Sequence, residues 1–343
     1  MGNHGNPTCL IRFNDARGTL VGRPNRGLEV MFTALNSTRL GSGMQGVALA
    51  EAAYQRAARY ARDRLKGRAP TGAKSPGQAA DAIIHHADIR RMLMDMRAFV
   101  EGGRALALWV AIQVDCAAKH PDATCRQSAD GIASLLTPVI KAHFTEMGFE
   151  CTVQAQQVFG GHGYIREVGV EQLVRDARLA MLYEGANGVQ ASELMLRKLQ
   201  SGGGHAIAHF LALVEECAES NCSRPEIGDF VTDLKGAVQH LRDAVGHVLH
   251  LLEDRREDAA AISAPFLRLV ALVAMAWTWM RLGDISARRL EELPERDERR
   301  MFYENKLVVG RYFMRQRLPE AHACHARIVA ASRPNFMLDA SRF

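Results

Sequence analysis

Hydrophobic residues recur at helical spacing through almost the whole chain after residue 28, and this periodicity limits the fold more than any other feature. In each run the apolar or small residues stand three or four positions apart, as one face of a helix requires. The three longest runs cover residues 28–66, 78–119 and 128–159. A Gly/Pro/Ser/Lys loop ends the first run, and His120-Pro121-Asp122 ends the second. Helices of this length, joined by short loops, predict an antiparallel bundle.

Shorter helices continue the pattern on both sides of the clearest linker in the chain, Ser201-Gly202-Gly203-Gly204. Two are expected before the linker, at about 170–182 and 188–200. The runs beyond it predict further amphipathic helices at about 205–219, 227–254, 259–283, 297–317 and 319–331. The chain is therefore predicted to be mainly α, with a helical bundle at 31–200 and a second helical domain at 205–343.

The first thirty residues differ in character, being rich in Gly, Asn and Pro. They contain two short β-like runs, Cys9-Leu10-Ile11-Arg12-Phe13 and Gly18-Thr19-Leu20-Val21-Gly22. A pair of strands this short is marginal alone. We therefore interpret residues 1–30 as the remnant of a β domain whose other strands come from elsewhere.

Charge and cysteine content exclude some function classes. The formal net charge is +5, but Lys and Arg alternate with Asp and Glu along the chain, whereas a nucleic-acid site needs basic residues gathered on one face. A mild positive charge favours an anionic small molecule that carries phosphates. The 7 cysteines include no CxxC pair, which is typical of a reducing compartment and predicts a cytoplasmic protein.

The most apolar stretch, 266–280, is interrupted by Arg268 and closed by Arg281. Its uncharged part is shorter than the roughly 20 residues of a membrane span, so a buried helix is expected. His240, His247 and His250 lie on roughly one face of a predicted helix. No second cluster completes a zinc site, and no metal is predicted.

Glycines interrupt the helical pattern at Gly160-Gly161-His162-Gly163-Tyr164. This loop follows a helix rather than a strand, so it does not match a dinucleotide fingerprint within a βαβ unit. Two interpretations remain: the glycines let the backbone approach a ligand closely, or they form an ordinary turn between helices.

Glu184 stands between Tyr183 and Gly185 at the end of the apolar run 179–182. Partial burial beside apolar side chains would raise the pKa of its carboxyl group toward neutrality, which suits a general base. The alternative is a solvated glutamate in a loop.

Several segments, in this order and spacing, resemble the active-site region of the acyl-CoA dehydrogenase family. They are Gln157-Val158-Phe159-Gly160-Gly161-His162-Gly163-Tyr164-Ile165, Arg175-Asp176-Ala177-Arg178 and Tyr183-Glu184-Gly185-Ala186-Asn187-Gly188-Val189-Gln190. Residues 31–64 resemble the first long helix of the family's C-terminal domain, and residues 1–30 resemble the end of its middle β domain. Residues after 204 resemble the helical extension of a subgroup that includes 3-methylmercaptopropionyl-CoA dehydrogenase-like enzymes.

The resemblance implies an FAD-dependent oxidoreductase of fatty acid metabolism that converts an acyl-CoA thioester to the trans-2-enoyl-CoA. Glu184 would be the base that removes the α-proton, while the β-hydrogen leaves as hydride to the flavin. The backbone N–H of the base and a ribityl hydroxyl of FAD would stabilise the enolate oxygen.

The resemblance also assigns binding roles by position. Arg64 matches an arginine that reaches the FAD of a neighbouring subunit. Gln157, Gly160 and Gly161 match the segment that holds the adenosine part of the same FAD. Asn36 and Arg39 fall where the family contacts the CoA ester, and Gly185 falls beside the reacting carbon. A buried structural ion pair is the alternative for Arg39.

Partners are implied in the same way: a homo-oligomer with electron-transfer flavoprotein as electron acceptor. Ala186 stands where many members have a threonine that contacts the flavin. Counterparts of the N-terminal helical domain and of the strands that hold the isoalloxazine ring are expected to lie outside these residues. The alternatives are a non-catalytic helical subunit, or pseudoenzyme, and a relative of the acyl-CoA oxidases.

Overall fold

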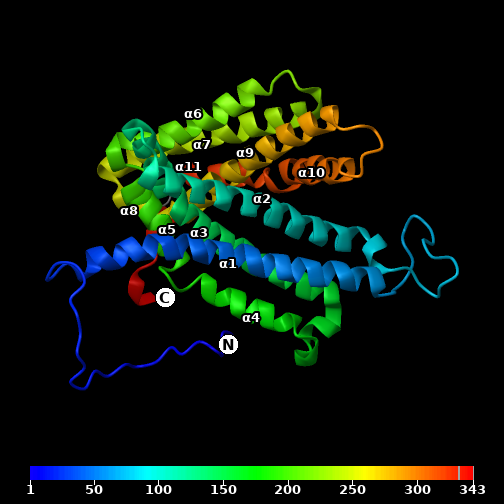
Figure 1. Ribbon diagram of the computed structural model, residues 1–343, viewed down its shortest axis with the longest axis horizontal. Helices are drawn as coiled ribbons and strands as arrows, with labels where there is room; N and C mark the ends of the chain where they lie inside the picture. The colour runs from blue at the N-terminus through cyan, green and yellow to red at the C-terminus, as the bar shows by residue number, and fades with distance from the viewer. Residues whose placement is uncertain (331–332, 343) are drawn as a thin grey trace.

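The computed structural model describes residues 1–330 and 333–342 and consists almost entirely of helices (Figure 1). The long helices are α1 (Gly27–Asp63), α2 (Ala87–Lys119) and α3 (Ala123–Phe159). They alternate in direction, so that α2 is antiparallel to both α1 and α3 (Figure 1). The predicted bundle is confirmed, and α3 lies at its centre. It packs against α1, α2, α4 (Val170–Ala180), α5 (Asn187–Glu193), α6 (His205–Ser220) and α9 (Ser263–Glu292).

Local signals explain where α3 begins. Asp122 precedes its first turn and accepts hydrogen bonds from the backbone N–H groups of Thr124 (2.6 Å) and Cys125 (3.1 Å). This is an N-cap, which satisfies donors that the helix cannot pair internally. Pro138 lies inside α3, and the helix continues past it to Phe159.

The predicted start of the second helix at residue 78 is wrong, because α2 begins at Ala87. Residues 64–86 form a loop with a short 3-10 turn, η1 (Ile83–His85). Asp81 is completely buried there and accepts backbone N–H bonds from Ala69 (2.9 Å), Lys74 (2.8 Å) and Ser75 (2.8 Å). These bonds compete with helix formation and hold the loop in a compact shape.

The two predicted N-terminal strands do not form. Residues 9–13 and 18–22 have no strand partner within the described chain, and their apolar side chains are exposed, Leu10 at 93% and Phe13 at 80%. A strand needs a neighbour for its backbone groups, and none is present here. The very beginning lies instead against α4, where the N–H of Asn3 donates to Oδ1 of Asp176 at 2.7 Å.

The rest of the chain adds shorter helices around the bundle (Figure 1). They are α4 (Val170–Ala180), α5 (Asn187–Glu193), α6 (His205–Ser220), α7 (Gly228–Asp254), α8 (Arg256–Ala261), α9 (Ser263–Glu292), α10 (Arg300–Tyr312) and α11 (Glu320–Val329). Two π-helical turns, η4 (Leu194–Lys198) and η7 (Phe313–Arg317), extend α5 and α10. The 3-10 turns are η2 (Gly160–Tyr164), η3 (Arg166–Val168), η5 (Ser201–Gly204), η6 (Pro225–Ile227), η8 (Arg333–Phe336) and η9 (Ala340–Arg342).

Helix α9 forms the middle of the C-terminal part. Within the described ranges it alone is long and apolar enough to cross a membrane, yet 89% of its most apolar window is buried inside the protein. The prediction of a buried helix at 266–280 is confirmed. The helix runs to Glu292, past the predicted end at 283, and its charged last turns are paired internally by contacts such as Arg288 Nε to Asp284 Oδ1 at 3.0 Å.

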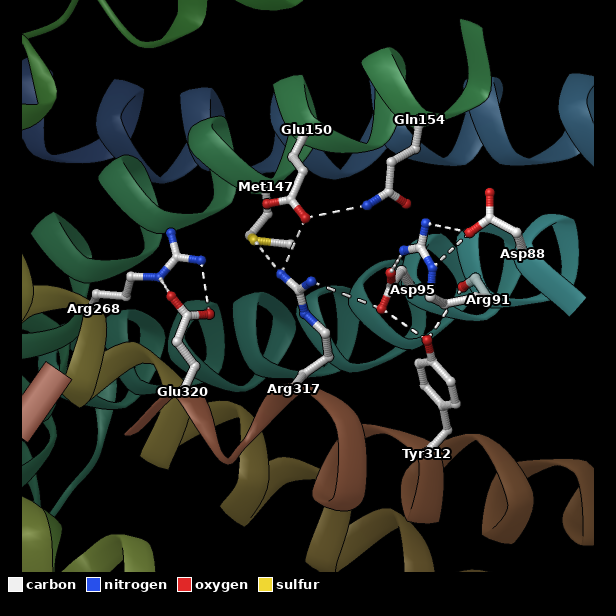
Figure 2. A network of polar contacts seen from close by, with 10 residues as sticks. All are labelled: Asp88, Arg91, Asp95, Met147, Glu150, Gln154, Arg268, Tyr312, Arg317 and Glu320. Atoms are coloured by element: carbon white, nitrogen blue, oxygen red, sulfur yellow. Dashed lines mark hydrogen bonds and ion pairs between the residues drawn. The ribbon is translucent and has the colours of Figure 1, made fainter. Parts of the chain in front are cut away.

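A polar network joins the C-terminal part to the bundle (Figure 2). Buried Asp95 of α2 accepts a hydrogen bond from the Tyr312 hydroxyl at 3.0 Å and lies 3.8 Å from Nη1 of Arg317. Arg317, in η7, also contacts Glu150 of α3 at 3.2 Å. The two helical parts also share one apolar core. The domain limits 1–30, 31–200 and 205–343 stay predictions.

Candidate active site

Glu184 lies on a tight turn between α4 and α5. Its φ is +55° and that of Gly185 is +86°, so two successive residues are left-handed. The turn closes where the N–H of Asn187 donates to the carbonyl oxygen of Met181 at 3.1 Å. A Cβ at position 185 would come within 2.6 Å of Nε2 of Gln190. The turn therefore favours glycine at this position for its φ, and a larger residue would also displace the Gln190 side chain.

The Glu184 side chain is half-buried against α1. Its Oε2 accepts a hydrogen bond from the Thr38 hydroxyl at 2.9 Å. The neighbouring Tyr183 hydroxyl donates to Oε1 of Gln45, also on α1. The segment 183–190 and the first turns of α1, which are 146 residues apart in sequence at this hydrogen bond, therefore meet in space.

Helix α3 also holds this turn, through Lys141. This side chain is 0% exposed, and its Nζ donates to the carbonyl oxygen of Gly185 (2.8 Å) and to Oδ1 of Asn187 (2.9 Å). Burial, and then the positive charge of Arg39, lower the pKa of Lys141 to about 8, against the opposing effect of Glu146 and Glu184.

Sequence reasoning missed Lys141, although a signal was present. Lys141 is the one charged residue of Ile140-Lys141-Ala142-His143-Phe144, a stretch of α3 that is buried throughout. A lysine in such a position is almost never fully buried without a partner. The partner is the glutamate turn, which only the tertiary structure brings to it.

Arg39 is buried and makes an ion pair with Glu193 of α5, Nη1 to Oε2 at 3.0 Å. This geometry is the structural ion pair that the sequence left open as an alternative. Arg39 also lines a cavity of about 590 Å³ between α1, α2, α3 and η4. It lies beside the turn, since its Nη2 would be 3.9 Å from a Cβ at Gly185. The side chain of Asn36 lies outside the described residues.

The other predicted site residues gather at the opposite end of the bundle. The ring of Tyr60, one turn before Arg64, stacks on Phe159 with centroids 4.2 Å apart, and Phe159 directly precedes Gly160. Gly160 has φ +59° and, like Gly161, has open space where a Cβ would stand. The side chains of Arg64 and Gln157 are exposed and have no hydrogen-bond or ion-pair partner in the described part of the chain.

These two groups of residues are far apart within one chain. Arg64 follows Thr38 by 26 residues, which is about 39 Å along α1 at 1.5 Å per residue. A ligand bound beside Glu184 therefore meets the Thr38 end of the bundle, and a ligand at the glycine turn meets the Arg64 end.

No group of three or more His, Cys, Asp or Glu side chains has an arrangement that could hold a metal ion, as far as the structure describes the chain. Of the histidines noted in the sequence, His240 of α7 lies near two histidines of α11. Its ring centroid is 4.8 Å from that of His325 and 5.2 Å from that of His322.

The bundle and its glutamate turn define a class of protein, the C-terminal part of an acyl-CoA dehydrogenase, and family comparisons agree. Residues 25–199 match the model of "Acyl-CoA dehydrogenase, C-terminal domain". Residues 207–339 match that of "Acetyl-CoA dehydrogenase C-terminal like". The chain belongs to the acyl-CoA dehydrogenase family.

Two curated relatives match nearly all of the chain. The 3-methylmercaptopropionyl-CoA dehydrogenase of Ruegeria pomeroyi is 36% identical over 335 residues, which are 96% of this chain and 55% of the relative. The broad-specificity linear acyl-CoA dehydrogenase FadE5 of Mycobacterium tuberculosis is 28% identical, over 93% of this chain and 54% of its own length. The chain thus spans about half the length of these relatives.

Solved structures show the same fold. An acyl-CoA dehydrogenase from Bacillus anthracis, complexed with FAD, has a TM-score of 0.68 at 15% identity and covers 88% of this chain and 50% of its own. ACDH-11 of Caenorhabditis elegans, in complex with C11-CoA, has a TM-score of 0.65 at 16% identity and covers 87% of this chain and 45% of its own. Their similarity places the helices of this chain within the family fold.

Proposed function

We propose that this chain carries the catalytic base of an FAD-dependent acyl-CoA dehydrogenase, and that the base is Glu184. The observation that carries the proposal is the half-buried Glu184 carboxylate on its left-handed turn, hydrogen-bonded to Thr38 of α1. Family membership and the relatives' activities support the substrate class, an acyl-CoA thioester.

In the proposed reaction, the Glu184 carboxylate takes the α-proton of the thioester. Thr38 donates to one carboxylate oxygen and leaves the other to accept this proton. Negative charge then grows on the thioester oxygen and needs a donor aimed at it. The backbone N–H of Glu184 makes no hydrogen bond within the described residues, so it is available for this role. FAD, when bound, supplies the acceptor for the β-hydride.

The residues at the far end of the bundle fit the adenosine and pyrophosphate part of FAD. Arg64 offers an unpaired guanidinium group, which suits a pyrophosphate, and Gly160 and Gly161 leave room for a close approach of the backbone. Because Thr38, which binds Glu184, lies about 39 Å from Arg64 along α1, we propose that these residues serve the active site of a second chain in a homo-oligomer.

The test is a flavin bleaching assay with Glu184→Gln. The FAD-loaded protein, mixed anaerobically with acyl-CoA, should lose the visible absorbance band of its oxidised flavin. Glu184→Gln should retain FAD and bleach at least about 10³-fold more slowly, because the amide cannot take the proton. Glu167→Gln, an exposed carboxylate of η3, is the control and should bleach normally. Bleaching of Glu184→Gln at the parent rate would exclude it as the base.

A non-catalytic helical subunit is the second candidate that the experiment must distinguish. It predicts a colourless protein whose melting temperature does not change with FAD or CoA esters. Co-expression with the N-terminal half of the Ruegeria relative provides the part of the family that this chain does not match. Flavin retained only in that complex would show that both polypeptides are needed to bind FAD.

The electron acceptor is the remaining part of the proposal. We propose an electron-transfer flavoprotein, as expected for a dehydrogenase. Hydrogen peroxide formed in proportion to the enoyl-CoA product would instead assign the chain to the oxidases.

A further inference from the structure

Lys141 is a buried cation that the proposed proton transfer does not use. It is flanked along α3 by Ile140 and Ala142, and all three are essentially inaccessible to solvent. Burying an ammonium group is unfavourable unless good acceptors surround it. The acceptors of Lys141 therefore indicate what the residue is for.

Both acceptors belong to the glutamate turn. Nζ donates to the carbonyl oxygen of Gly185 at 2.8 Å and to Oδ1 of Asn187 at 2.9 Å, and these residues are one and three positions after Glu184. Asn187 is itself attached to α3, because its Nδ2 donates to the carbonyl oxygen of Ala142 (3.2 Å) and to Oε1 of Glu146 (3.1 Å). Helix α3 thus holds the downstream side of the turn through one lysine and one asparagine.

The turn needs these hydrogen bonds because its backbone conformation is unfavourable without them. A non-glycine residue at φ +55°, as Glu184 is, lies in a region that costs free energy unless its surroundings impose it. This φ, together with that of Gly185, sets the direction of both the Glu184 side chain and its N–H. A small relaxation of the turn would turn the carboxylate and the N–H away from a common substrate.

We propose that Lys141 is a positioning residue for Glu184, and that its ammonium group fixes the left-handed turn by binding the Gly185 carbonyl and the Asn187 amide. That Lys141 fixes the turn does not depend on which reaction the site performs. The consequence for catalysis rests on the proposed function of Glu184.

Charged groups near Lys141 make its hydrogen bonds to the turn sensitive to pH. They are Arg39 from α1, Glu146 from α3 and Glu184 from the turn, and the pKa of Lys141 is about 8. Above this pH the neutral amine keeps its geometry but loses its charge, and charge-assisted hydrogen bonds are about twice as strong as neutral ones. The Gly185 carbonyl would then depend more on Gln190 Nε2, which lies 3.4 Å away.

Hydrogen–deuterium exchange of the 343-residue chain tests whether Lys141 fixes the turn, without flavin or substrate. Lys141→Met keeps most of the volume and removes the donors. We expect the hydrogen-bonded amides of the turn, those of Leu182, Tyr183 and Asn187, to exchange at least about tenfold faster than in the parent chain, since a charged hydrogen bond that holds the turn is lost. The exposed lysine variant Lys119→Met should leave these amides unchanged. Equal protection of Leu182, Tyr183 and Asn187 in Lys141→Met and the parent chain would overturn the proposal.

The parent chain provides a second test that does not depend on a variant folding. Its protection factors at Leu182, Tyr183 and Asn187, corrected for intrinsic exchange, should fall between pH 7 and pH 9 with a midpoint near the Lys141 pKa of about 8. Amides in the middle of α3 should show no such midpoint. A flat profile at the turn would overturn the pH sensitivity of the contacts that Lys141 makes with it.

Kinetics separate positioning from catalysis if the bleaching assay works. Lys141→Met should lower the bleaching rate at least about tenfold with little change in the acyl-CoA concentration for half-maximal rate, and Lys141→Arg should restore part of the rate. A parent rate in Lys141→Met would overturn the catalytic consequence. If the parent protein itself does not bleach, the proposed function fails while the exchange results still decide the role of Lys141.

Discussion

His143, two residues after Lys141, shows how burial acts on a single side chain. It is almost fully buried, and its Nδ1 has no hydrogen-bond partner among the described residues. Burial, together with the positive charges of Arg268 and Arg317, lowers its pKa to about 3. The imidazole is therefore neutral in the folded protein at neutral pH, although an unfolded histidine titrates at a pKa of about 6.5.

We predict that this histidine makes the protein sensitive to acid. Between pH 6.5 and 3 the unfolded chain binds a proton at His143 that the folded chain does not. The free energy of unfolding should then fall with decreasing pH by up to roughly 1.4 kcal/mol per unit from this group. His143→Leu should remove this part of the slope in urea denaturation series from pH 7 to pH 4. The exposed His250→Leu is the control; a slope unchanged in His143→Leu would contradict the prediction.

At the scale of elements, the contact between α1 and α3 determines how the site is assembled. The two helices approach closely where Gly46 faces Gly148, and a Cβ on Gly148 would lie 2.6 Å from the carbonyl oxygen of Gly46. A Cβ on Gly46 would overlap the backbone of Phe144. Thr38 and Lys141 bind the glutamate turn from these two helices. The distance between α1 and α3 therefore also determines how the turn is held.

We predict opposite effects for two glycine substitutions in α1. Gly46→Ala should destabilise the protein by about 1–3 kcal/mol, because the added methyl group forces the helices apart. Gly41→Ala, in open space on the same helix, should stabilise it by up to about 1 kcal/mol, since alanine favours helix. Guanidinium denaturation followed by circular dichroism measures both. Equal effects would mean that helix propensity alone matters here.

At the scale of the whole molecule, the polar network of Figure 2 makes the C-terminal part continuous with the bundle. Asp95 is its centre, since it contacts Arg91 of its own helix (3.1 Å) as well as Tyr312 and Arg317 of the C-terminal part. Burial and the nearby Asp95 carboxylate raise the pKa of the Tyr312 hydroxyl, which therefore remains a donor at neutral pH.

We predict that Asp95→Ala costs about 3–5 kcal/mol in stability, because it leaves the partly buried Arg317 and the Tyr312 hydroxyl without this acceptor. Asp88→Ala, which removes an exposed partner of the same Arg91, should cost less than about 1 kcal/mol. Denaturation monitored by tryptophan fluorescence and by circular dichroism should give a single coincident transition in the parent protein. Two separate transitions there would show that the halves unfold independently.

Much of the fold could be predicted from the sequence. Helix-period apolar runs predicted the bundle, and the interrupted stretch around Arg268 predicted that α9 is buried rather than membrane-spanning. The prediction failed at the start of α2, where buried Asp81 binds backbone donors across the loop. It also failed at residues 9–13 and 18–22, where β propensity cannot form a strand without a neighbour.

By itself, the sequence determined the helices and the motif that contains Glu184, because both depend on residues within a few positions of one another. Only the tertiary structure decided that Thr38 binds this glutamate and Lys141 the residue after it, that Arg39 pairs with Glu193, and that Arg64 lies at the far end of the bundle. The physical reason is that burial and hydrogen bonding join groups that are distant along the chain, and no local pattern records which distant group will become the partner.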